Sequence, residues 1–128
     1  MQADLSMKAP LHILSAEDQR LYSEMVSNLF EKAGHTVTTA ENGQDALDLA
    51  SMARFDALVT DHKMPHIDGL VLVTRLKGIG FPGRIVVHSS RLTEDEATSY
   101  RGLGVDCIVK KGPETANLVG LTEALFLA

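Results

Sequence analysis

Short hydrophobic runs alternate five times along the chain with longer stretches of helical periodicity. The short runs cover residues 11–15, 36–39, 55–60, 84–89 and 105–110. Three of them contain continuous hydrophobic stretches rich in β-branched residues, at 57–59, 85–87 and 107–109. Strands buried on both faces of a parallel sheet have this composition. The pattern therefore predicts five strands.

The intervening stretches predict five helices. In residues 18–33 the apolar residues Leu21, Met25, Leu29 and Ala33 recur every four positions, flanked by Tyr22, Val26 and Phe30. This spacing predicts an amphipathic helix that ends at Gly34.

Capping residues mark the later helices. Asn42 is a candidate cap for a helix that ends near Met52, and Asp68 for one that ends near Gly78. The capping-box sequence at 93–96 begins a fourth helix, which has the weakest apolar stripe. We expect a fifth helix over residues 114–127, with Leu118, Leu121 and Leu125 facing inward.

Five strand–helix units with right-handed crossovers predict an α/β fold with a doubly wound five-stranded parallel sheet. The strand order expected for this flavodoxin-like (βα)5 arrangement is 2-1-3-4-5, with the site at the carboxyl ends of the central strands. We expect a single domain over residues 11–128 and a flexible N-terminal tail over residues 1–10.

Composition narrows the class of function. The 128 residues are 45% hydrophobic and 23% charged, as in an ordinary globular domain. The net charge of −5 argues against direct nucleic-acid binding. The sequence has no apolar stretch of bilayer length, and its first ten residues do not resemble a secretory signal. We expect a cytoplasmic protein that does not bind membranes, in agreement with its single cysteine.

Polar residues follow four of the predicted strands. Glu17 and Asp18 follow the first strand and Asp61 the third, while Ser89 ends the fourth and Lys111 follows the fifth. Three carboxylates at one edge of a sheet repel one another, and Mg²⁺ is a suitable counter-ion because it prefers oxygen ligands. A phosphoryl group on one carboxylate would need cationic and hydroxyl partners, which Lys111 and Ser89 provide.

Each of these residues also has an ordinary explanation. Acidic pairs after strands often cap helices, and a lone aspartate at a strand end is often a turn residue. The coincidence at four strand ends favours a functional site.

The segment from Asp56 to Gly69, DALVTDHKMPHIDG, resembles the phosphoacceptor signature of the receiver domains of bacterial two-component response regulators. Three further segments resemble other strands of that family: ILSAED (13–18) the first strand with its acidic pair, IVVHSS (85–90) the strand that carries a Ser or Thr, and GVDCIVKK (104–111) the strand that ends in a Lys. The resemblance covers about residues 11–127.

The resemblance implies a role for each candidate residue. Asp61 would be the nucleophile that takes a phosphoryl group from a phosphohistidine. Asp18 and Asp61 would bind Mg²⁺ directly, with Glu17 acting through a water and the backbone carbonyl of Lys63 as a further ligand. Lys111 and Ser89 would contact the phosphoryl oxygens. The protein would then be a signalling switch and not a metabolic enzyme, with catalysis limited to its own phosphorylation and dephosphorylation.

The family resemblance also implies partners. A sensor histidine kinase or a phosphotransfer protein would donate the phosphoryl group. A downstream protein would dock on the face formed by the fourth helix, fifth strand and fifth helix, and homodimerisation through the two helices stays open. Either the domain acts alone or the sequence is part of a longer protein.

Several residues depart from the family pattern or add charge near the site. Ile108 stands where an aromatic residue is common, so it is either a plain strand residue or a sign of altered signal transmission. Gly112 separates Lys111 from Pro113, which leaves the geometry of that peptide open. Lys63 and Arg91 add positive charge, either as solvated side chains or as groups that alter the lifetime of the acyl phosphate.

Other functions remain as alternatives. The chain could be a receiver-like interaction module that works without phosphorylation, or a small flavin or phosphate-ester enzyme of the same architecture. The enzyme is disfavoured because no phosphate-binding loop follows the first strand, where Glu17 and Asp18 would instead repel a phosphate. Transition-metal binding by His62, His66 and His88 is disfavoured because Pro65 prevents a helix that would align the first two.

Overall fold

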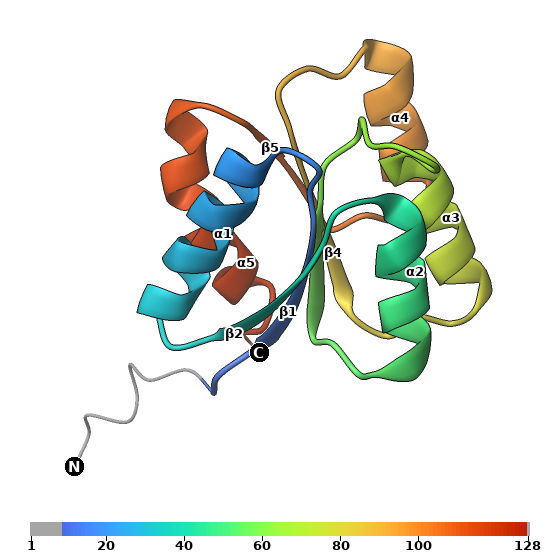
Figure 1. Ribbon diagram of the computed structural model, residues 1–128. Coiled ribbons are helices and arrows are strands. Elements are labelled where there is room, and N and C mark those ends of the chain that lie inside the picture. The colour runs from blue at the N-terminus through green and yellow to red at the C-terminus, as the bar shows by residue number, and fades with distance from the viewer. Residues whose placement is uncertain (1–8, 128) are drawn as a thin grey trace.

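A parallel five-stranded sheet forms the centre of the protein in the computed structural model, which describes residues 9–127 (Figure 1). Its strands are β1 (His12–Ala16), β2 (Thr36–Ala40), β3 (Ala57–Thr60), β4 (Arg84–Ser89) and β5 (Cys107–Lys110). They are arranged in the order β2-β1-β3-β4-β5, and all neighbouring pairs are parallel. The predicted α/β class and strand order are confirmed.

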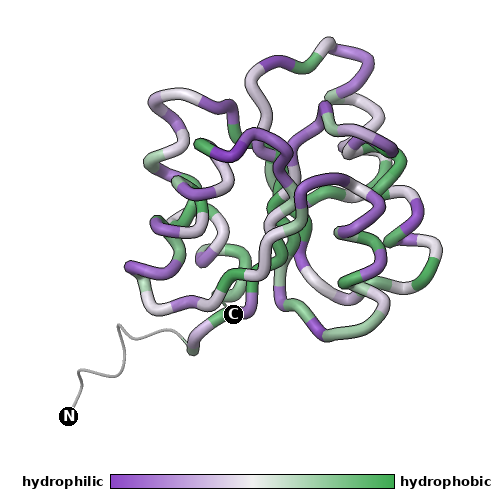
Figure 2. Tube along the Cα trace, in the orientation of Figure 1, coloured by the Kyte–Doolittle hydropathy of each residue, from purple (hydrophilic) through white to green (hydrophobic). Residues whose placement is uncertain are grey.

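Helices cover both faces of this sheet. They are α1 (Arg20–Lys32), α2 (Gly43–Met52), α3 (Gly69–Gly78), α4 (Glu94–Gly102) and α5 (Leu118–Ala124), the last preceded by the 3-10 helix η2 (Pro113–Asn117). Figure 1 shows α1 and α5 on one face, with α2, α3 and α4 on the other. Two hydrophobic clusters fill the spaces between the sheet and the helices on its two faces. In Figure 2 the hydrophobic residues concentrate on the central strands, and the outer surfaces of the helices carry most of the hydrophilic ones.

Side-chain caps begin three helices where the sequence predicts them. The side chains of Asn42, Asp68 and Thr93 each accept a hydrogen bond from the backbone N–H three residues later. These bonds satisfy donors that the first helical turn leaves unpaired, which stabilises each helix by about 1 kcal/mol.

The amphipathic helix α1 forms as predicted, but the four-residue repeat is not its buried face. The four-residue repeat points largely outward, since Leu21 is 75% and Met25 40% exposed. The flanking residues Val26 and Phe30 are the buried ones. Both stripes have helical spacing, so periodicity alone did not distinguish the stripe that faces the sheet.

The C-terminal helix also differs from its prediction. It starts as η2, and α5 ends at Ala124 instead of Leu127. Leu118 faces inward as expected, Leu125 is half-buried, and Leu121 is 42% exposed. Thr122 takes an inward position and donates its hydroxyl hydrogen bond to the Leu118 carbonyl oxygen, 2.8 Å away. This bond satisfies the hydroxyl group, so the threonine can lie on a buried helical face.

Strand β5 differs from the fully buried strand that its hydrophobic run predicts. It lies at the edge of the sheet and pairs only with β4. Cys107 and Ile108 are therefore half-buried, whereas every residue of β3 is buried. β3 and β5 each begin two residues later than expected.

Two aspartates tie neighbouring strands together at the amino edge of the sheet. Asp56 lies just before β3, and its Oδ2 accepts a 2.8 Å hydrogen bond from the backbone N–H of His12 in β1. Asp106 lies just before β5, and its Oδ2 accepts a 2.8 Å bond from the N–H of Ile85 in β4. These carboxylates satisfy strand-end donors that have no partner in the sheet.

The remaining predictions concern the termini and one loop. The expected N-terminal tail at residues 1–10 lies outside the described residues, except for the exposed Ala9 and Pro10. The Lys111–Gly112 peptide is trans, and Gly112 has a φ of 129°, a conformation that glycine tolerates. Among the helices of residues 9–127, none is long and apolar enough to cross a membrane.

Candidate functional site

Parallel register brings the polar strand-end residues to one edge. Ala16 pairs with Thr60, so the residues that follow them, Glu17 and Asp61, lie side by side. The Asp61 N–H donates to the Ala16 carbonyl oxygen at 2.9 Å. On the other side of β3, the Lys111 N–H donates to the Ser89 carbonyl oxygen at 2.9 Å. The structure thus brings the predicted residues of four strands together.

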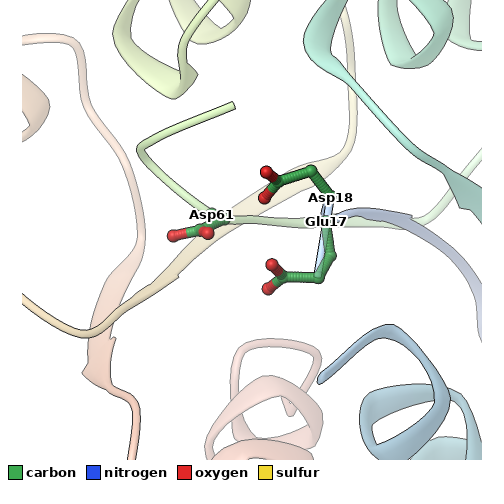
Figure 3. Close-up of side chains that lie close together, drawn as sticks. All are labelled: Glu17, Asp18 and Asp61. Atoms are coloured by element: carbon green, nitrogen blue, oxygen red, sulfur yellow. The ribbon is translucent and has the colours of Figure 1, made fainter. Parts of the chain in front are cut away.

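Three carboxylates gather at the ends of β1 and β3, as Figure 3 shows. One oxygen from each of Glu17, Asp18 and Asp61 lies within 4.8 Å of the other two. Glu17 and Asp61 are only 4% and 7% exposed, whereas Asp18 is exposed. Burial, opposed by the hydrogen bond from Lys111, raises the pKa of Glu17 to about 7.

The Lys111 ammonium group lies between two of these carboxylates. Its Nζ is 2.9 Å from Glu17 Oε1 and 2.9 Å from Asp61 Oδ2. Burial alone would lower the pKa of Lys111, but the hydrogen bonds to the two carboxylates raise it above its usual value. The ammonium also lies 4.4 Å from the ring centroid of Tyr22, within the range of a cation–π contact. Lys111 therefore stays charged and fixed in direction.

Both oxygens of Asp61 accept hydrogen bonds from the protein. The backbone N–H of His62 donates to Oδ1 at 2.7 Å, and Lys111 donates to Oδ2 at 2.9 Å. The carboxylate borders an open pocket of about 650 Å³, which Lys63, Ser89 and Arg91 also line. A group entering this pocket meets a carboxylate that is already oriented.

The chemistry of the donor set fits Mg²⁺. All three clustered side chains offer carboxylate oxygens, the hard ligands that Mg²⁺ prefers, and the exposed Asp18 leaves room for metal-bound waters. Lys111 neutralises one of three negative charges, so a divalent cation would balance the rest. Lys63 lies at the pocket and its side chain is exposed.

Two residues near the site have contacts that were not predicted. Tyr22 was expected only as a flanking residue of the α1 stripe, yet its ring covers Lys111. His62 was considered for metal binding, yet its ring contacts Tyr100 and Glu96 of α4. His62 directly follows Asp61, and this adjacency was the signal available in the sequence.

The structure shows the surroundings of two further residues near the site, His88 and Ile108. His88 is buried in β4, with Nε2 2.9 Å from the Thr115 hydroxyl. Burial lowers the pKa of His88 to about 4, and the nearby Lys111 adds to this effect. Ile108 is half-buried against the cluster on the α4 side of the sheet. His88 is therefore a neutral core residue near the site.

Comparison with known protein families finds a match over most of the chain. Residues 13–123 match the model of the response regulator receiver domain. A response regulator receiver protein of Anaeromyxobacter sp. (strain Fw109-5) is 35% identical over 98 residues, which are 77% of this chain and 41% of that protein. The chain spans about half, or less, of the length of the curated relatives that it matches.

Solved structures share the fold. The chemotaxis response regulator CheY4 of Vibrio cholerae has a TM-score of 0.82 at 23% identity, covering 92% of this chain and all of that one (100%). The response regulator TrrA of Thermotoga maritima, in complex with Mg²⁺ and BeF, has a TM-score of 0.80 at 22% identity, covering 91% and 99%. At these identities the likeness concerns the fold.

Proposed function

The chain belongs to the response regulator receiver domains of two-component signalling, and we propose that its Asp61 accepts a phosphoryl group beside a bound Mg²⁺ ion. One observation carries this proposal. The Asp61 carboxylate is held by the His62 N–H and the Lys111 ammonium, and it faces an open pocket next to two further carboxylates. A purely structural aspartate has no need of such a pocket.

The proposed reaction is a direct transfer from a phosphohistidine. An Asp61 oxygen attacks the phosphorus, an O–P bond forms and the P–N bond breaks, and the bonding electron pair returns to the imidazole nitrogen of the donor. Phosphoryl transfer depends mainly on positioning and charge stabilisation. Lys111 lies within 2.9 Å of Asp61 and supplies positive charge to the phosphoryl oxygens. The Ser89 hydroxyl, at the end of β4, is suited to donate to one of them.

Asp18 and Asp61 would hold the metal directly, Glu17 would act through a water, and the Lys63 carbonyl would be a further ligand. Bound Mg²⁺ would neutralise the charge that crowds this edge during transfer. The clustered oxygens support this role, and the neighbour TrrA was solved with Mg²⁺ and BeF.

Receiver domains of response regulators interact with histidine kinases, and we propose a kinase or a phosphotransfer protein as the donor. The signal would pass to a downstream protein on the face of α4, β5 and α5, where two copies of the chain could also pair. The proposed location is the cytoplasm. The net charge of −5 supports a protein partner over nucleic acid.

Intact-mass measurement tests the proposal. The protein is incubated with Mg²⁺ and acetyl phosphate, and the expected result is one added phosphoryl group that requires Mg²⁺. Asp61→Asn should abolish the adduct, because an amide oxygen is a poor nucleophile. Asp106→Asn is the matched control, since Asp106 lies at the opposite edge of the sheet. An unmodified wild-type protein, or an adduct that persists in Asp61→Asn, would contradict the proposal.

A further inference from the structure

The ring of His62 connects the acceptor residue to helix α4. His62 directly follows Asp61, is only 8% exposed, and donates its backbone N–H to Asp61 Oδ1. Its ring Nδ1 lies 2.7 Å from the Tyr100 hydroxyl oxygen, and Nε2 lies 3.0 Å from Glu96 Oε2. Both partners belong to α4. One residue therefore contacts the acceptor carboxylate through its backbone and α4 through its side chain.

The chemistry of the partners fixes the roles in this network. The Glu96 carboxylate can only accept, so Nε2 of His62 carries a proton and donates. Nδ1 lies at hydrogen-bond distance from the hydroxyl group of the buried Tyr100. Burial raises the pKa of Tyr100 above its usual range, which keeps the hydroxyl group protonated. The backbone N–H of Thr93, helped by His62, lowers the pKa of Glu96 and keeps it charged.

Helix α4 has few other attachments to the core. Tyr100 is its single buried residue. Glu96 Oε2 contacts His62, while its Oε1 accepts the Thr93 N–H at 2.9 Å and closes the capping box. The absence of a side chain at Gly69 makes room for the network, since a methyl group there would overlap the Tyr100 hydroxyl and the Asp61 carbonyl oxygen. The polar contacts of His62 are thus a substantial part of what positions α4.

We infer that His62 is a positioning residue that couples the state of the Asp61 carboxylate to the stability of α4. The regulatory part of this inference rests on the proposed phosphorylation. Formation of an acyl phosphate moves negative charge from the carboxyl oxygens to the phosphoryl group, so the His62 N–H loses a charged acceptor. Hydrogen bonds to charged groups are about twice as strong as neutral ones. A shift of His62 then changes the contacts of Tyr100 and Glu96, because both bond directly to its ring.

The half-buried Ile108 makes the coupling from Asp61 to α4 through His62 more important. Its side chain packs against the same cluster as Tyr100 but carries no polar atom that could bond to the site. His62 instead provides a continuous chain of hydrogen bonds from Asp61 to two residues one turn apart in α4.

A double-mutant cycle tests the coupling without phosphorylation. Hydrogen exchange of the α4 amides is measured by mass spectrometry in wild type, Asp61→Asn, Tyr100→Phe and the double variant. Tyr100→Phe keeps the ring and removes the hydroxyl group, and we expect α4 to exchange about fivefold faster, as loss of one net hydrogen bond predicts. Coupled neighbours give a double variant that departs from the product of the single effects by at least about twofold. Effects that multiply would overturn the inference.

Glu96→Gln and Glu94→Gln form a matched pair for the same measurement. Each neutralises one carboxylate in the first turn of α4, but only Glu96 bonds to His62. We expect coupling to Asp61→Asn for Glu96→Gln and multiplicative effects for Glu94→Gln. Equal coupling for the two variants would show a general charge effect and overturn the specific role of His62.

The regulatory consequence is measured on the phosphorylated protein. Acetyl phosphate and Mg²⁺ should change α4 exchange in the wild type, and Tyr100→Phe should lose that response while reaching the same adduct mass. An adduct with an unaltered α4 response in Tyr100→Phe overturns the coupling. The lack of an adduct in the wild type contradicts the proposed function instead, and the cycle with Asp61→Asn still decides the inference.

Discussion

Replacement of Lys111 with methionine is expected to destabilise the protein in a manner that depends on pH and metal. The substitution keeps a long unbranched side chain and removes the ammonium that lies 2.9 Å from both Glu17 and Asp61. In the absence of a divalent cation, two nearly buried carboxylates would then face each other without a counter-charge. This differs from loss of a surface ion pair, which costs about 1 kcal/mol or less.

The magnitude follows from burial. Removing one partner of a buried ion pair costs about 3–5 kcal/mol. Glu17 can relieve part of this cost by taking up a proton, since its pKa is already raised to about 7. We therefore expect a loss of about 3–5 kcal/mol at alkaline pH, and a smaller one where Glu17 is protonated. A loss of about 3 kcal/mol corresponds to a fall in Tm of about 10 °C for a domain of this size.

The pH dependence has a definite sign. Loss of Lys111 raises the folded-state pKa of Glu17 further above its unfolded value. A raised carboxyl pKa means that stability is lost as pH increases, because the unfolded state binds fewer protons than the folded state. The deficit of Lys111→Met should therefore be larger above about pH 7 than below it.

Thermal unfolding followed by circular dichroism checks these expectations, with EDTA or Mg²⁺ on either side of that pH. Mg²⁺ should recover part of the loss by supplying the missing positive charge. Lys110→Met is the control, because Lys110 is the preceding, exposed residue of β5. A loss no larger than that of Lys110→Met, or one independent of pH, would refute the reasoning.

Three further predictions concern the surroundings of Asp61. Binding of Mg²⁺ should weaken as pH falls below about 7, because a proton on Glu17 competes with the metal, and calorimetry that finds equal affinity on both sides would contradict this. His88→Gln should make stability less sensitive to acid between about pH 6.5 and 4. In that range His88 is protonated in the unfolded state and neutral in the folded state, so the wild type loses stability as the pH falls. In the variant, the slope of the unfolding free energy against pH should decrease by the equivalent of about one bound proton. Lys63→Ala and Arg91→Ala should each change the lifetime of the acyl phosphate, which is measured as the decay of the adduct mass. Unchanged lifetimes would show that both are ordinary solvated side chains.

Local signals predicted most of the fold. Caps at Asn42, Asp68 and Thr93 placed three helix starts, and the run at 57–59 marked a strand buried on both faces. The strand-end positions of Glu17, Asp61 and Lys111 were enough to predict that they meet, because parallel register carries them to one edge.

The sequence was not sufficient where tertiary packing decides between equal local choices. Leu21 and Val26 both belong to apolar stripes of α1, and only the orientation of the helix on the sheet determines that Val26 is buried. The contact of His62 with Tyr100 joins residues 38 positions apart, and no periodicity connects them. The ring of Tyr22 over Lys111 is likewise a product of how α1 packs beside β5's C-terminal loop.

The acidic residues at the two edges of the sheet have opposite effects on the stability of this protein. At the amino edge, Asp56 and Asp106 each satisfy a strand N–H, so their replacement by alanine should reduce stability. At the carboxyl edge, Glu17 and Asp18 repel neighbouring carboxylates, so their neutralisation should increase it when no metal is bound. A selection for thermal resistance alone would therefore preserve the first pair and erode the second. Variants enriched by such a selection would be the ones that had lost the proposed metal-binding edge, so stability would be gained at the expense of the proposed signalling function.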